Sequence, residues 1–142
     1  MLTNQTCFYA EAGGQVGDSG TIKTESGIFK VEDTQKFFGS LFVHIGVLIN
    51  GEIKISQDSI LEVDRSRRAN IKSNHSATHL LHAALREELG NHVAQRGSYV
   101  GPDRLRFDFS HSKQIKQTEL NKINNRVNYF VKQDSKVTTR LM

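Results

Sequence analysis

Between residues 6 and 64, apolar and β-branched side chains occur in short runs that are separated by turn residues. The runs at 21–23, 28–31, 41–45 and 60–63 are rich in β-branched and aromatic residues, as strands are. Turn residues lie between them at 25–27, 38–40, 50–51 and 57–59. Asn50-Gly51 is the strongest hairpin signal, because a two-residue type I′ turn needs positive φ at both positions. This part of the chain predicts a small antiparallel β-barrel or sandwich.

The period of the pattern changes near residues 64–70. From 74 to 89 the apolar residues recur at helical spacing and form one stripe, which consists of Ala77, Leu80, Leu81, Ala84 and Leu85. Ser73 or Asn74 is expected to cap the start of this helix. Gly90 is expected to end it, because glycine accepts the left-handed conformation found at helix C-termini.

Two further strands and a second helix complete the prediction. Residues 92–100 and 105–109 are strand-like, and 101–103 form the turn between them. An amphipathic stripe predicts a final helix over 118–132, with Thr118 as its cap. The predicted fold class is α+β, with a glycine-rich β-barrel-like subdomain over 1–66 and a helix–two-strand–helix part over 67–142.

Composition fits a soluble intracellular domain. Hydrophobic residues make up 37% of the chain and charged residues 24%, which allows a packed core. No run reaches the roughly 18 apolar residues of a membrane helix, and the first residues lack the layout of a signal peptide. Cys7 is the only cysteine, so an internal disulfide and an all-cysteine zinc site are excluded. Its apolar neighbours predict that it is a buried small hydrophobe.

The charge of the chain permits a phosphate-bearing partner without requiring one. The net charge is +4, and four cations fall within the eight positions of residues 65–72, called here the basic segment. A solvated approach to the helix and a contact with a nucleic-acid backbone explain this segment equally well.

His75 and His79 are the main candidates for chemistry. They lie at i and i+4 on the predicted helix, on a face other than the apolar stripe, so both imidazoles can converge on one metal ion. Two ligands do not complete a tetrahedral site, and spacing alone favours a surface or hydrogen-bonded pair. His82, at i+7, is a third histidine of the same helix. The general base of the H-E-x-x-H proteases is absent, because Ser76 follows His75.

Two other stretches carry polar or flexible groups. Residues 11–20, called here the glycine-rich segment, hold four glycines within eight positions and do not match a nucleotide-binding loop. A tight turn between strands explains it better than a substrate-facing loop does. Gln95 lies on a predicted strand, where its amide can hydrogen-bond a substrate or a metal-bound water.

Taken in order, these motifs resemble the editing region of the alanyl-tRNA synthetases. The resemblance rests on residues 6–20, 74–81, 95–98 and 104–111, and it covers essentially the whole chain. It implies an aminoacyl-tRNA synthetase, a ligase that attaches alanine to its tRNA using ATP. In that family the editing domain hydrolyses alanine tRNA mischarged with serine or glycine, because a synthetic pocket cannot strongly reject them.

The resemblance also implies a zinc site. The family holds zinc with an H-x-x-x-H pair, which corresponds to His75 and His79, and with a later C-x-x-x-H pair. The family's substrate-proximal glutamine corresponds to Gln95, which is therefore the predicted catalytic residue. No histidine follows His111 and no cysteine follows Cys7. We therefore expect a fragment that lacks the second ligand pair and the ATP-using domain, that binds zinc weakly or not at all, and that lacks full editing activity.

The expected partner is the acceptor end of alanine tRNA, in the cytoplasm, with no DNA and no membrane. Exposed apolar surface allows a homo-oligomer. Two alternatives stay open: a free-standing protein that edits mischarged alanine tRNA, and a non-enzymatic RNA-binding module. A generic metallohydrolase is the weakest alternative, because no carboxylate adjoins the histidine pair. Zinc could activate water or orient the substrate.

Overall fold

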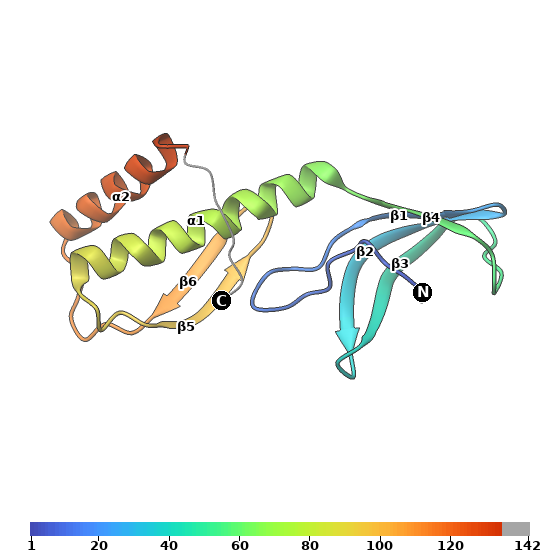
Figure 1. Ribbon diagram of the computed structural model, residues 1–142, viewed down its shortest axis with the longest axis horizontal. Helices are drawn as coiled ribbons and strands as arrows, with labels where there is room; N and C mark the ends of the chain where they lie inside the picture. The colour runs from blue at the N-terminus through green and yellow to red at the C-terminus, as the bar shows by residue number, and fades with distance from the viewer. Residues whose placement is uncertain (135–142) are drawn as a thin grey trace, which may run out of the picture. The chain divides into compact units, whose positions relative to one another are not determined.

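The structure is a computed structural model and describes residues 1–134 (Figure 1). By their contacts these residues form two compact units. The first unit is Met1–His75 with Ser98–Arg106, and the second is Ser76–Gly97 with the described residues from Phe107 onward. The division into domains at 1–66 and 67–142 stays a prediction, and its last eight residues lie outside the described part.

The first unit is built on one antiparallel sheet. Its strands are β1 (Gly20–Thr24), β2 (Gly27–Phe37), β3 (Leu41–Gly51) and β4 (Ser59–Val63), in the order β3-β2-β1-β4. All four predicted strand regions are confirmed, and so is the α+β class. The sheet is open rather than closed into a barrel, because β3 and β4 are its two edges and pair only with β2 and β1.

The hairpin between β2 and β3 turns at Phe38-Gly39, one of the predicted turns. Both residues have positive φ, 50° and 77°, as a type I′ turn requires. The prediction of a hairpin at Asn50-Gly51 is wrong. These two residues extend β3 and pair with Ile28 and Gly27 of β2, because pairing along the long hairpin continues past the local turn signal.

The core of the first unit lies on one side of β1 and β2. Phe8, Ile22 and Val31 form its buried cluster. Cys7 is exposed, so the prediction of a buried thiol is wrong. Side chains of an extended segment alternate in direction, and Phe8 and Ala10 occupy the buried positions. Cys7 consequently faces outward.

The long helix α1 (Arg65–Leu89) begins nine residues earlier than predicted. Asp64 caps it, since the Arg67 backbone N–H donates to the Asp64 carboxylate at 2.9 Å. Ser73 and Asn74 are interior helix residues and not caps. The arginine-rich first turns are good helix formers, so the helix extends back to the first strong cap. Gly90 ends the helix as predicted, with φ of 111° and its N–H bonded to Arg86 O at 3.0 Å.

The hairpin strands β5 (Gln95–Val100) and β6 (Leu105–Phe109) follow, and then α2 (Gln117–Lys132). The cap of α2 is Lys116 and not Thr118, because the Glu119 carboxylate accepts the Lys116 N–H at 2.7 Å. In the second unit α2 lies along the C-terminal half of α1 (Figure 1). The buried cluster of this unit consists of Ala84, Leu85, Val93 and Ile123. No helix in the described residues is long and apolar enough to cross a membrane.

Candidate functional site

The glycine-rich segment makes a two-residue turn in the first unit. Ala12 and Gln15 exchange backbone hydrogen bonds at 3.0 and 3.2 Å. Gly13 and Gly14 lie between them with φ of 59° and 84°, values that favour glycine. The predicted tight turn is confirmed.

This turn packs against the end of β5. Val100 N–H donates to Gly14 O at 2.8 Å, and Val16 N–H donates to Val100 O at 3.1 Å. A Cβ on Gly14 would lie 2.3 Å from the carbonyl oxygen of Ser98, so only glycine permits this approach. The Ser98 hydroxyl also donates to Gly13 O at 3.2 Å. The motif at residues 95–98 therefore supports the glycine-rich turn through its last residue.

The turn brings Gln15 to His75. The amide oxygen of Gln15 lies 2.6 Å from His75 Nδ1. An amide oxygen only accepts hydrogen bonds, so this contact is a hydrogen bond when Nδ1 carries the proton. The neighbouring Asn74 donates from its side-chain amide to Gly101 O at 2.8 Å. This turn of α1 is thus held at two successive residues.

The two candidate ligands are both exposed residues of α1. His75 and His79 are exposed, while Ala84 and Leu85 of the predicted apolar stripe are buried. Neutral imidazole is a common zinc ligand, so the donor chemistry suits zinc. The described residues hold no cluster of three or more His, Cys, Asp or Glu side chains that could hold a metal ion. Zinc binding by His75 and His79 stays a prediction.

The other candidates in the second unit differ in burial. The ring of His82 packs on Phe107, with 5.1 Å between centroids. Its Nε2 is buried and has no hydrogen-bond partner among the described residues. Gln95 opens β5 with an exposed side chain, and its catalytic role stays a prediction.

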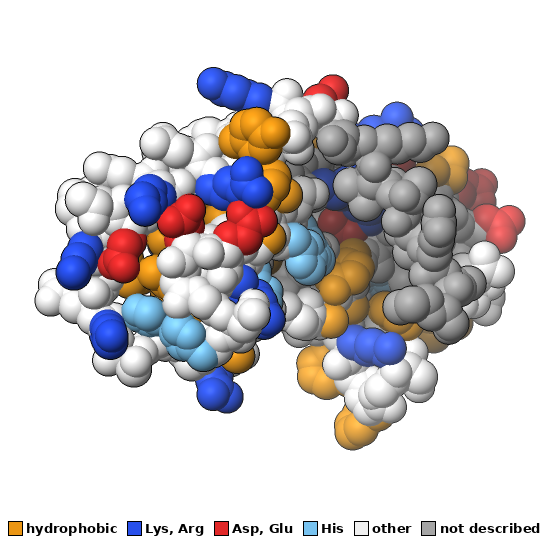
Figure 2. Space-filling view, turned by 60° about the vertical axis from the view of Figure 1, so that its left-hand side comes forward, with side chains coloured by type: hydrophobic (Ala, Val, Ile, Leu, Met, Phe, Trp, Pro, Cys, Tyr) orange, Lys and Arg blue, Asp and Glu red, His pale blue; other side chains and the backbone are white. Residues whose placement is uncertain are grey.

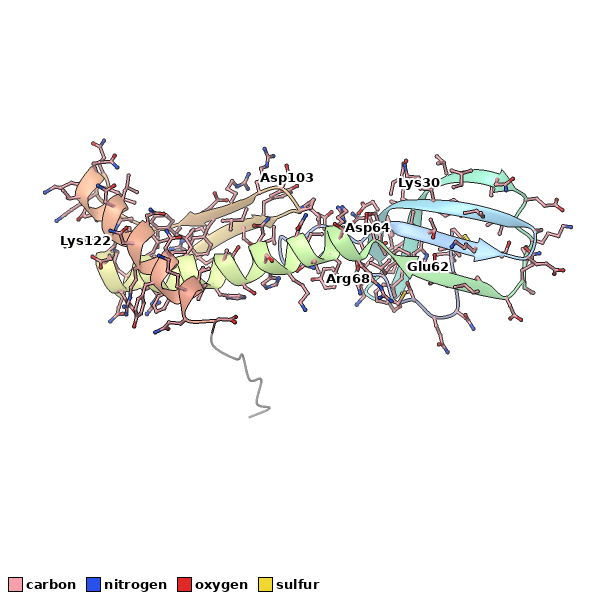
Figure 3. All side chains as sticks on the ribbon, turned by 90° about the horizontal axis from the view of Figure 1, so that it is seen from above. Lys30, Glu62, Asp64, Arg68, Asp103 and Lys122 are labelled. Carbon is pink, nitrogen blue, oxygen red and sulfur yellow. The ribbon has the colours of Figure 1, made fainter. Side chains whose placement is uncertain are left out.

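An ion pair between the buried Asp18 and Arg68, which is labelled at the start of α1 in Figure 3, anchors the glycine-rich segment to this helix. Asp18 is 2% exposed, and its carboxylate accepts from the Arg68 guanidinium and, at 2.7 Å, from Tyr9 N–H. The hydrogen bond to Asp18 is the main cause of the raised pKa of Arg68. Arg67 donates to Gly17 O at 2.7 Å. Two of the four cations in the basic segment therefore bind their own chain.

Gln15, Asp18 and Arg68 were not predicted to contribute to the site. Gln15 and His75 are 60 positions apart, and Asp18 and Arg68 are 50 apart. Neither pair has a spacing that a single sequence can reveal. Covariation between aligned relatives is the signal that could have found them.

One hollow of the first unit has a lining that includes none of these residues. It measures about 1220 Å³ and is lined by residues 1–7 and 53–59, with Thr24 and Leu61. It contains no predicted site residue, so the candidate site is defined by side-chain contacts and not by a cavity.

The comparisons with known proteins agree with the motifs. Residues 1–67 match the class II (A) family of tRNA synthetases. Over its whole length the chain is 54% identical to the alanine–tRNA ligase of Bradyrhizobium diazoefficiens, and 56% identical to those of Chelativorans sp. strain BNC1 and Paracoccus denitrificans. It spans 16% of the length of each of these relatives. The chain belongs to the alanine–tRNA ligase family.

Proposed function

We propose that this chain is the part of an alanine–tRNA ligase that edits mischarged tRNA. The observation that carries the proposal is the 54–56% identity to alanine–tRNA ligases along all of the chain. This chain also contains His75, His79 and Gln95 in the order of the editing motifs. The relatives are named as ligases, which favours the synthetase version over a free-standing editing protein. The substrate is alanine tRNA that carries serine or glycine.

In this proposal His75 and His79 hold zinc with ligands from outside the described residues. Bound zinc would supply a Lewis acid that polarises an oxygen or activates water. Gln95, exposed at the start of β5, would hydrogen-bond the aminoacyl group. The glycine-rich turn would hold the His75 side of the site through Gln15.

The proposed whole enzyme also attaches alanine to tRNA with ATP, in the cytoplasm. Its partner is the acceptor end of alanine tRNA. The alternative of a non-enzymatic RNA-binding module is less favoured, because Arg67 and Arg68 bind their own chain. On the second unit, Lys and Arg side chains mix with Asp and Glu on the face seen in Figure 2. Lys122 and Arg126 lie 4.0 and 2.6 Å from Glu88 and Glu87.

The proposal is tested by editing in a defined enzyme. The 142 residues replace the matching stretch of the Paracoccus denitrificans alanine–tRNA ligase, to which they are 56% identical. Serine release from mischarged alanine tRNA is then compared between this chimera and its His75→Ala and His79→Ala variants. We expect both substitutions to abolish release, whereas His92→Ala, a control at an exposed histidine outside α1, retains it. Full release by the His75→Ala and His79→Ala variants would contradict the proposal.

A further inference from the structure

We propose that Gln15 is a positioning residue that holds His75 in the tautomer with the proton on Nδ1, so that Nε2 presents its lone pair to a metal ion. This inference rests on the proposed function, because it assigns Gln15 to the same zinc site. It goes beyond that function because it assigns to the glycine-rich segment the positioning of the His75 ring.

The amide of Gln15 directs its Oε1 toward His75 Nδ1, and in this orientation the contact is a hydrogen bond when Nδ1 carries the proton. Gln15 Oε1 lies 2.6 Å from His75 Nδ1, and the oxygen has no proton to donate. A neutral imidazole with hydrogen on Nδ1 carries its lone pair on Nε2. Ligating histidines commonly donate their other ring nitrogen to such an acceptor, and loss of that acceptor lowers metal affinity about 10- to 100-fold.

The backbone of Gln15 is fixed on both sides. Its N–H and carbonyl pair with Ala12, and the next residue, Val16, pairs with Val100 of β5. The approach of Gly14 to Ser98 leaves no space for a side chain at position 14. The amide therefore projects from an ordered turn, which lowers the entropy cost of holding the histidine.

The backbone of α1 at His75 is also fixed by a contact of the neighbouring residue. Asn74, the preceding residue of α1, donates to Gly101 O at 2.8 Å. Both partners of the Gln15–His75 contact thus come from ordered backbone in the first unit. Because the ring is exposed and its Nδ1 is taken up by an acceptor, it has the form in which imidazole binds zinc.

The test reads the tautomer of His75 by ¹⁵N NMR of the full chain without metal, and the zinc affinity by titrating the chimera, in which the proposed further ligands are present, with zinc chloride. In the unsubstituted chain we expect the proton on Nδ1. Gln15→Met, of similar length but without an acceptor, should move the proton toward Nε2 in the full chain and lower the zinc affinity of the chimera at least about 10-fold. Gln15→Glu keeps an acceptor oxygen and should preserve the Nδ1 tautomer.

Gln35→Met is the matched control. Gln35 is also a half-buried glutamine of the first unit, but its amide donates to Glu11 at 2.9 Å and Asp33 at 2.6 Å, not to a histidine. It should leave the His75 tautomer and the zinc titration unchanged. His44, whose Nδ1 lies 3.2 Å from Met1 O, reports in the same spectra that each variant is folded.

Two results would overturn the inference. A proton on Nε2 of His75 in the unsubstituted chain, or an Nδ1 tautomer that survives Gln15→Met in a folded variant, would contradict the positioning role. Equal zinc affinity of the chimera and of its Gln15→Met variant would overturn the metal-directing part. Failure of editing in the chimera with the tautomer result intact would count against the proposed function alone.

Discussion

The guanidinium of Arg68 donates to the carboxylate of Asp18, fifty residues earlier in the chain, and joins the start of α1 to the glycine-rich segment. Asp18 is almost fully buried, whereas the Arg68 side chain is 38% exposed. The pair therefore stabilises the fold chiefly because water cannot reach Asp18 to replace its partner.

Arg68→Met should destabilise the fold by about 2–3 kcal/mol, because among the described residues it leaves the buried Asp18 carboxylate with the Tyr9 N–H as its one remaining donor. This value is below the full range for a broken buried pair, since Arg68 is partly exposed. Urea denaturation measures the change. The exposed pair of Lys23 and Glu62 is the control, and Lys23→Met should cost less than about 1 kcal/mol. Equal losses in the two variants would contradict the anchoring role of Asp18 and Arg68.

Substitutions at Gly13 and Gly14 compare the effect of a left-handed backbone alone with the effect of close packing in the glycine-rich turn. Both have positive φ, but a Cβ on Gly14 would meet Ser98 O at 2.3 Å, whereas a Cβ on Gly13 would meet nothing within 4 Å. Gly13→Ala should cost about 1–2 kcal/mol from the left-handed backbone alone. Gly14→Ala should cost more, because the strand must also move. Equal midpoints of urea denaturation for the two variants would rule out close packing of the turn on β5.

His44 should make stability depend on pH. Burial lowers its pKa below the ordinary 6.5, against the opposing effect of the hydrogen bond to Met1 O. The folded chain therefore keeps His44 neutral at pH values where the unfolded chain binds a proton. Stability should be unaffected by this group above about pH 6.5 and should fall as the pH drops from there toward the lowered pKa, with a slope of at most about 1.4 kcal/mol per pH unit.

Urea denaturation between pH 7.5 and 5 measures this slope. His44→Gln cannot titrate, so its slope should be smaller even though the variant itself is less stable. An unchanged slope would show that the pH dependence comes from other groups.

Local signals in the sequence were sufficient for most elements of the fold. Gly90 ends α1 as predicted, because a left-handed C-terminus depends on the residue itself. The start of α1 was misplaced, because Asp64 and two good caps further along, Ser73 and Asn74, have similar local signals. The helix-forming residues that follow Asp64 and the bond from Arg68 to Asp18 together favour the earlier cap.

Only the part of the candidate site that depends on local spacing was predicted from the sequence. His75 and His79 share one helix, so their spacing is visible in the sequence, and both are exposed as expected. The contact of His75 with Gln15 depends on how the glycine-rich turn packs on β5. Such long-range packing leaves no periodic pattern along the chain.

The most direct test of the editing assignment is the ratio of initial deacylation rates on alanine tRNA charged with serine and with alanine, measured with zinc in the chimera that carries these 142 residues. Editing predicts a ratio well above one that falls to the background level in His75→Ala. A ratio of one, or a high ratio that His75→Ala leaves unchanged, would contradict it.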